Sequence, residues 1–106
     1  MADVRRKVDF ALVNRAAISA LPNILARLVP GGRIRACEYI VKNPTRADRH
    51  PGSFRINMRT GRWADFATED RGGDPVSLVA FLEGVPQPKA ARLLGQMLSI
   101  DVEVGK

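Results

Sequence analysis

The sequence has very little of the chemistry that builds metal centres or covalent cross-links. Cys37 is its one cysteine and His50 its one histidine. A single cysteine excludes a disulfide within the chain, and a Cys/His metal site would have at most two such ligands. Neither residue belongs to a nucleophile, base and acid pattern suited to covalent catalysis. We therefore expect no metal, no other cofactor and no enzymatic activity, with His50 on the surface and Cys37 buried and inert in a strand.

Long apolar runs are also missing. No stretch approaches the roughly 20 apolar residues that a membrane-spanning helix needs, and Met1 to Lys7 lead into an amphipathic segment rather than a signal-peptide core. We expect no membrane partner and a cytoplasmic location. The seven prolines and nine glycines are spread along the chain and mark no linker or repeat. Residues 1–106 are therefore expected to form one domain with a modest core.

Acidic residues are scarce where basic ones gather. The chain has 17 lysine and arginine residues against 11 aspartate and glutamate residues, a net charge of +6. The stretch from Arg33 to Arg62 contains eight basic side chains but only Glu38 and Asp48 as acids. Thirteen of the basic residues are arginine, which binds phosphate bidentately and stacks on bases, although a GC-rich genome favours the same residue. This distribution indicates an acidic partner.

Two helices are predicted before the basic stretch. Asp9 can cap a first helix from Phe10 to about Ala20. Pro22 either breaks this pattern or starts a second helix, which Pro30 and the two glycines after it end. The side chains available to the buried faces are Leu12, Ala16, Ile18, Ile24, Leu25 and Leu28.

Two further helices are predicted near the C-terminus. Asp74 and Pro75 form an N-cap and first-position pair that opens a helix ending at Gly84. Pro88 can start the last helix, which a polar tail from Asp101 to Lys106 follows. The apolar residues at helical spacing are Val76, Val79, Ala80, Leu82, Ala90, Ala91, Leu94, Met97 and Leu98.

The middle of the chain alternates as strands do. Arg33 to Lys42 predicts one strand buried on more than one face, and residues 43–52 predict a loop. Apolar and polar residues then alternate strictly over 53–58, as in a half-buried strand. Residues 59–62 predict a hairpin turn with glycine at position 61, and the run at 63–66 predicts the antiparallel partner. Helices in separate runs around a small antiparallel sheet indicate an α+β fold.

Four segments between residues 22 and 100 carry a family resemblance: Asn43–Arg46, His50–Asn57, Gly61–Thr68 and Gly72–Asp74. In order and spacing they resemble the zinc-ribbon domain of bacterial and phage DNA primases. In that family a Cys-Pro-x-His element precedes a Pro-Ser-Phe strand, a hairpin leads to a Cys-x-x-Cys element, and a Gly-Asp pair opens the next helix. The last two segments also look like parts of primase and helicase proteins of phages, plasmids and integrative elements.

The resemblance implies that four former ligand positions have been replaced. They fall at Asn43 and Arg46, where the first ligand pair stands in the family, and at Asp65 and Thr68, where the Cys-x-x-Cys pair stands. This set does not suit a structural zinc, which is held by thiolate and imidazole. The resemblance thus implies a metal-free zinc-ribbon-like hairpin core. We predict that Arg46 pairs with Asp65 across the former site, with Asn43 and Thr68 satisfying the remaining hydrogen bonds.

Primase zinc ribbons are associated with template recognition, so the resemblance implies a non-catalytic DNA-binding accessory module in the replication system of a phage or mobile element. We expect it to prefer single-stranded over double-stranded DNA, and a primase or helicase is a further candidate partner. The candidate nucleic-acid-binding residues are Arg33, Arg35, Arg55, Arg59, Arg62 and Trp63. An exposed face of Tyr39 is a further candidate for base stacking. Trp63 has an alternative role as core filler.

Three other interpretations stay open beside this one. The chain could be a protein-interaction adaptor that keeps the fold and docks on a replication enzyme or a host protein. The backbone at Gly72 and Gly73 could cradle a phosphate, but capping by Asp74 explains the same residues. The carboxylates of Asp65, Glu69 and Asp70 with Asp74 could bind magnesium, but Asp65 and Asp74 already have structural explanations.

Overall fold

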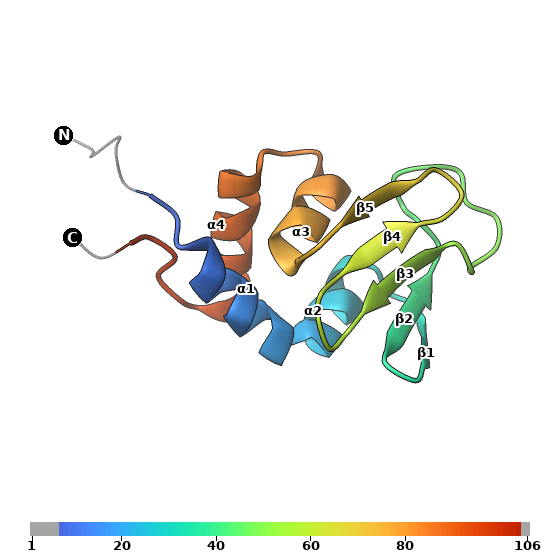
Figure 1. Cartoon of the computed structure of the whole chain (residues 1–106), viewed down its shortest axis with the longest axis horizontal. Coiled ribbons are helices and arrows are strands. Elements are labelled where there is room, and N and C mark those ends of the chain that lie inside the picture. Colours follow the sequence, from blue (N-terminus) through green and yellow to red (C-terminus); the bar gives the residue numbers. More distant parts are fainter. Residues whose placement is uncertain (1–6, 105–106) are drawn as a thin grey trace.

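Four helices and five antiparallel strands make up the computed structural model, which describes residues 7–104 (Figure 1). The predicted α+β class is confirmed. The helices are α1 (Phe10–Ser19), α2 (Leu21–Leu28), α3 (Pro75–Glu83) and α4 (Gln87–Leu98). The strands are β1 (Arg33–Arg35), β2 (Glu38–Val41), β3 (Phe54–Asn57), β4 (Trp63–Asp65) and β5 (Asp70–Gly72), and they lie side by side in chain order.

Helices α1 and α2 begin where local chemistry places them. The Asp9 side chain accepts a hydrogen bond from the Leu12 main-chain N–H at 3.1 Å, and Pro22 lies in the first turn of α2, so Pro22 starts a helix rather than only ending one. The buried face of α1 differs from the expected one. Val13 and Ala17 are fully buried while Leu12, Ala16 and Ile18 are half-buried, because the four-residue spacing of Val13 and Ala17 continues directly into Leu21 of α2.

The prediction of one strand from Arg33 to Lys42 is wrong. The chain turns back at Ala36, whose φ is 55°, so that Arg35 of β1 faces Glu38 of β2. An alanine in the left-handed region is uncommon, and no glycine or proline marks the turn. Cys37 therefore lies half-buried in this turn rather than buried in a strand.

A second difference is the edge strand β5. Residues 68–73 lead into a helix, and the sequence suggested only a connection there. The structure pairs Asp70–Gly72 with Trp63–Asp65 of β4, so the sheet gains one more strand. The predicted hairpin between β3 and β4 is confirmed, with Gly61 at a φ of 81°.

One face of the sheet packs on the helices. Phe54 and Trp63 contact each other edge to face with ring centroids 6.3 Å apart, and Trp63 lies 4.7 Å from Phe81 of α3. The indole N–H of Trp63 donates to the Ser77 hydroxyl at 3.0 Å. Figure 1 shows α2 behind the strands, with the other three helices gathered beside them. We call the face that carries Phe54 and Trp63 the inner face.

The C-terminal segment is not only a polar tail. Val102 is buried against the core, and its carbonyl accepts from the Asp9 N–H at 2.7 Å. A bridge between Val8 and Glu103 extends this contact. The absence of a side chain at Gly95 makes room for Val102, since a Cβ at that position would collide with it. The two ends of the described chain are thereby joined.

Candidate nucleic-acid interface

The sheet has a second face, pointing away from the core, and arginine dominates it. We call it the outer face. Because side chains alternate along strands, residues opposite the buried Phe54 and Ile56 belong to it, and the prediction that Arg55 and Asn57 lie there is confirmed by their half-exposed positions. Register places one residue from each strand in a row across this face. The row is Arg33, Ile40, Arg55, Ala64 and Arg71.

A second row runs beside the first. Glu38 lies directly opposite both Arg35 and Asn57, and the Asn57 N–H donates to the Arg62 carbonyl at 2.7 Å. The outer face thus carries Arg33, Arg35, Arg55, Arg62 and Arg71 from both rows together, against Glu38 as the one acidic side chain in these rows.

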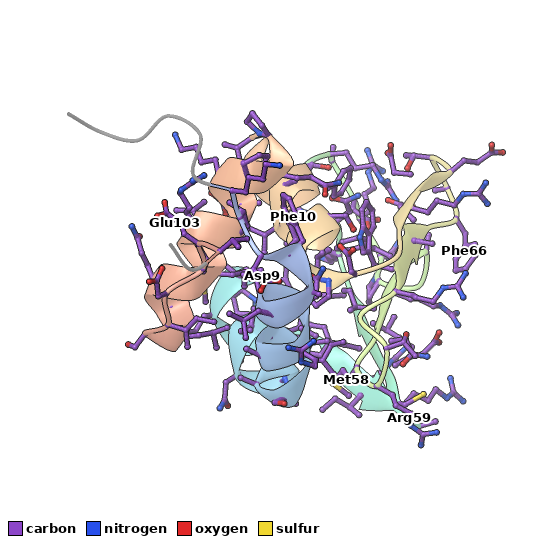
Figure 2. The ribbon with its side chains drawn as sticks, turned by 60° about the vertical axis from the view of Figure 1, so that its left-hand side comes forward. Asp9, Phe10, Met58, Arg59, Phe66 and Glu103 are labelled. Atoms are coloured by element: carbon purple, nitrogen blue, oxygen red, sulfur yellow. The ribbon has the colours of Figure 1, made fainter. Side chains whose placement is uncertain are left out.

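A shallow groove of about 900 Å³ lies on the outer face. Arg55, Arg62 and Arg71 line it together with Glu38 and Asn57. Phe66, which follows β4, also lines the groove and is 69% exposed. Figure 2 shows Phe66 on the far side of the strands from α1. An exposed aromatic ring thus stands in a groove with three guanidinium groups.

Most of these arginines are free to bind a ligand. Arg55 is the exception, because its Nε donates to the Gly52 carbonyl at 2.8 Å and its Nη1 donates to Glu38 Oε1 at 3.3 Å. The other four arginines of the outer face have no side-chain hydrogen bond or ion pair with any residue of 7–104. They are Arg33, Arg35, Arg62 and Arg71. Their charges face solvent without local neutralisation.

Two aromatic residues expected at the interface lie elsewhere. Trp63 is on the inner face and only 6% exposed, so its alternative role in the core is confirmed. It touches the groove only from below, and its role in nucleic-acid binding stays a prediction. Tyr39 is also buried, and its hydroxyl donates to the Val29 carbonyl at 2.6 Å. Both belong to the inner set by alternation, since Tyr39 and Trp63 each face Ile56 in the register.

Arg59 stands apart from the groove. It lies in the turn between β3 and β4, where its main-chain N–H donates to Asn57 Oδ1 at 2.8 Å. Figure 2 shows it at one end of the sheet. Its side chain is exposed and adds positive charge at the rim rather than within the groove.

Sequence reasoning missed two residues of the interface. Arg71 is not among the residues predicted from the sequence, and it reaches the outer face because β5 pairs with β4. Phe66 is also absent from the predicted binding residues, since the run at 63–66 predicts only a strand. Alternation along the strand could have predicted its position. Ala64 and Phe66 are two residues apart, so their side chains point to the face opposite that of Trp63 and Asp65.

A second cluster of side chains lies between the loop of residues 43–52 and β4. The predicted pairing of Arg46 with Asp65 is confirmed there. Arg46 Nε donates to Asp65 Oδ2 at 2.8 Å and its Nη2 donates to Oδ1 at 3.2 Å. Asn43 Nδ2 also donates to Asp65 Oδ2, at 2.8 Å. Asp65 is fully buried and Asn43 nearly so. We call Asn43, Arg46 and Asp65 the Asp65 cluster.

Thr68 does not join this cluster as expected. Its hydroxyl donates to Asp70 Oδ2 at 2.8 Å, while the Ala67 main-chain N–H donates to Asp65 Oδ1 at 2.9 Å and fills the remaining place. The tight turn after β4 brings this N–H back over the carboxylate. The donors around Asp65 are thus one guanidinium, one amide and one main-chain N–H.

The residues at the four positions do not fit a zinc ion. The guanidinium of Arg46 already neutralises the Asp65 carboxylate, and neither guanidinium nor threonine hydroxyl is a usual zinc ligand. Across residues 7–104, no three His, Cys, Asp or Glu side chains gather where they could hold a metal ion. Asp74 caps α3 by accepting from the Ser77 N–H at 2.8 Å, which agrees with its predicted capping role.

The cluster predicts a pH-dependent stability. The hydrogen bond from Arg46 holds the pKa of Asp65 well below its usual range, with smaller contributions from Asn43 and Ala67, and outweighs the opposing effect of burial. A carboxyl whose pKa is lower in the folded state stabilises the fold above its unfolded pKa of about 3.9 and loses that contribution as pH falls below it. The stability difference between wild type and Asp65→Ala should therefore be full at pH 7 and shrink at pH 3. Urea unfolding at both pH values measures it, and a difference that stays constant would contradict the assignment.

The rest of the described chain offers no other obvious functional centre. None of the helices within residues 7–104 is long and apolar enough to cross a membrane. Two other hollows lie among the helices and at the C-terminal segment, and neither gathers cationic and aromatic side chains as the outer face does. No protein-family model matches the chain, and no curated protein is significantly similar to it.

Proposed function

We propose that this protein is a non-catalytic module that binds single-stranded DNA on the outer face of its sheet. The observation that carries the proposal is the charge of that face, where five arginines from four parts of the chain stand against Glu38. The face forms only when all five strands pair. The positive charge of the outer face therefore depends on the folded sheet and not on one basic stretch of sequence.

Arginine and phenylalanine supply complementary contacts with a nucleic acid strand. The planar guanidinium binds phosphate oxygens bidentately, and Arg62 and Arg71 are free to do so. Phe66 exposes its ring in the same groove. A base stacked on an aromatic side chain contributes about 1 to 3 kcal/mol of binding free energy.

The groove suits a single strand better than a duplex. The faces of paired bases are covered by their neighbours in a duplex, so the Phe66 ring can stack only on an unpaired base. We further propose, from the resemblance to primase zinc ribbons, that the module acts beside a primase or helicase of a phage or mobile element.

Fluorescence anisotropy tests the proposal, with a labelled 12-residue oligothymidine compared with a 12-base-pair duplex. Release of counterions from three or more phosphates makes the logarithm of the affinity fall with the logarithm of salt concentration, with a slope of about −2 or steeper. Replacing Phe66 with alanine should weaken single-strand binding and leave duplex binding unchanged. Absence of oligothymidine binding at low salt would contradict the proposal and favour the adaptor interpretation.

A further inference from the structure

We infer that the outer face reads the identity of a base, and that Glu38 and Asn57 form a recognition pair for guanine in an unpaired strand. This inference rests on the proposed function and names the ligand of the same face more closely. Glu38 places a carboxylate in the groove beside the three arginines that line it. A carboxylate repels phosphate, so Glu38 weakens the attraction that the surrounding arginines produce.

Glu38 has an unused acceptor. Its side chain is 39% exposed, and its Oε1 accepts from Arg55 Nη1 at 3.3 Å. Within residues 7–104 its other carboxylate oxygen has no hydrogen-bond partner. The contact with Arg55 restrains the carboxylate at the groove while leaving acceptor positions open on both oxygens, since each has two lone pairs.

Asn57 has an unused donor in a fixed orientation. Its Oδ1 accepts from the main-chain N–H groups of Arg59 and Thr60 at 2.8 and 3.1 Å. Two such bonds identify this atom as the oxygen and restrain the carboxamide. For the described residues, Asn57 Nδ2 has no acceptor. The turn after β3 therefore leaves the amide N–H groups of a groove-lining side chain available to a ligand.

Register places these two groups side by side. Glu38 and Asn57 are direct cross-strand partners, and side chains in such pairs start from Cβ atoms about 5 Å apart. The pair offers one donor next to two acceptors. The Watson–Crick edge of guanine presents the complement, namely the O6 acceptor followed by the N1–H and N2–H donors. Adenine and cytosine present a donor where O6 stands in guanine, so they place a donor against Nδ2.

The base edge must be unpaired to be read in this way, because a duplex already uses it. Arg62 lies next to Asn57 on the neighbouring strand, and the Asn57 N–H donates to the Arg62 carbonyl. The guanidinium of Arg62 can therefore stack on the face of the guanine that Asn57 and Glu38 bind. Phe66 lies at the other end of β4, next to Ser53, to which its N–H is bonded at 2.9 Å. Phe66 therefore serves a neighbouring nucleotide of the strand, independently of the guanine.

The test compares a 12-residue deoxyadenosine oligonucleotide with one that carries guanine at every third position, using anisotropy with the whole chain. A bidentate pairing discriminates against a wrong base by roughly tenfold in affinity, so the guanine oligonucleotide should bind about ten times more tightly. Hypoxanthine, which lacks the N2 amino group, should reduce this ratio. 7-Deazaguanine, which keeps the Watson–Crick edge, should preserve it.

Two variants distinguish recognition from simple charge. Glu38→Gln should bind the deoxyadenosine strand more tightly and lose most of the guanine preference. Asn57→Asp retains the acceptor for Arg59 and Thr60 and should lose the preference without unfolding the turn. Glu83→Gln, the same charge change on α3, should preserve the ratio. Equal affinities for the two oligonucleotides in wild type would overturn base reading and leave the proposed function standing, whereas absence of binding to either would overturn both.

Discussion

Replacing Asp65 with alanine is expected to lower the free energy of unfolding by about 3 kcal/mol. The change leaves the buried Asn43 amide without its acceptor and leaves Arg46 with only the longer ion pair to Asp48 at 3.5 Å. Asp65 is fully buried and accepts from Arg46, Asn43 and the Ala67 N–H. All three donors lose their acceptor in the variant, and Asn43 is itself buried. For a chain of this size the melting temperature should fall by more than about 10 °C.

Urea unfolding of wild type and variant measures this loss. Asp70→Ala is the matched control, because Asp70 is an exposed carboxylate on the neighbouring strand. Among the described residues, its side chain accepts a hydrogen bond only from Thr68. This variant removes the same charge, and surface substitutions usually change stability by no more than about 0.5 kcal/mol. Equal stability losses in the two variants would show that the Asp65 cluster does not hold the 43–52 loop to the sheet.

Replacing Arg55, Arg62 and Arg71 together with alanine is expected to weaken oligothymidine binding by about a hundredfold at 0.1 M salt. Each phosphate contact with a single strand contributes about 0.7 to the slope of log affinity against log salt. The loss of three contacts therefore corresponds to about a hundredfold at 0.1 M salt. The slope should become less steep by about 2. All three side chains line the groove, and Arg62 and Arg71 have no internal partner within residues 7–104.

The control for this variant has the same net charge but leaves the groove intact. Arg15, Arg27 and Lys89 are exposed basic residues of α1, α2 and α4, away from the outer face. Their combined replacement by alanine should reduce binding only slightly, by lowering the overall charge. Similar losses in both triple variants would mean that net charge, and not the outer face, drives association. Circular dichroism of each variant confirms that it is folded before affinities are compared.

The predictable parts of the fold share a local cause. Asp9 and Asp74 cap helices through hydrogen bonds to main-chain N–H groups three residues further on. Both partners therefore lie within a short stretch of sequence. The hairpin with Gly61 is similar, because its turn requires a positive φ that glycine adopts readily. The pairing of Arg46 with Asp65 spans 19 residues, and it followed only from the family resemblance of the segments that carry the two residues.

The errors arose where tertiary contacts outweighed local preference. No residue around Ala36 is typical of a chain reversal. The left-handed conformation of Ala36 is found together with the antiparallel pairing of β1 with β2. Val102 lies in a segment predicted to be a polar tail. Its side chain is nevertheless buried against α4, where Gly95 has no side chain. In both cases the deciding contact is with a residue that a local pattern does not include.

The sequence by itself determined which residues alternate, where most helices start and that arginine predominates over acidic residues in the middle of the chain. Alternation divides each strand into two sets of side chains but does not say which set is covered. Only the packing of α2 and α3 against Phe54 and Trp63 decided that Trp63 is buried and that Arg55 and Arg62 are not. Only the pairing of β5 added Arg71. A surface formed by five strands depends on their register, which long-range hydrogen bonds and burial set together.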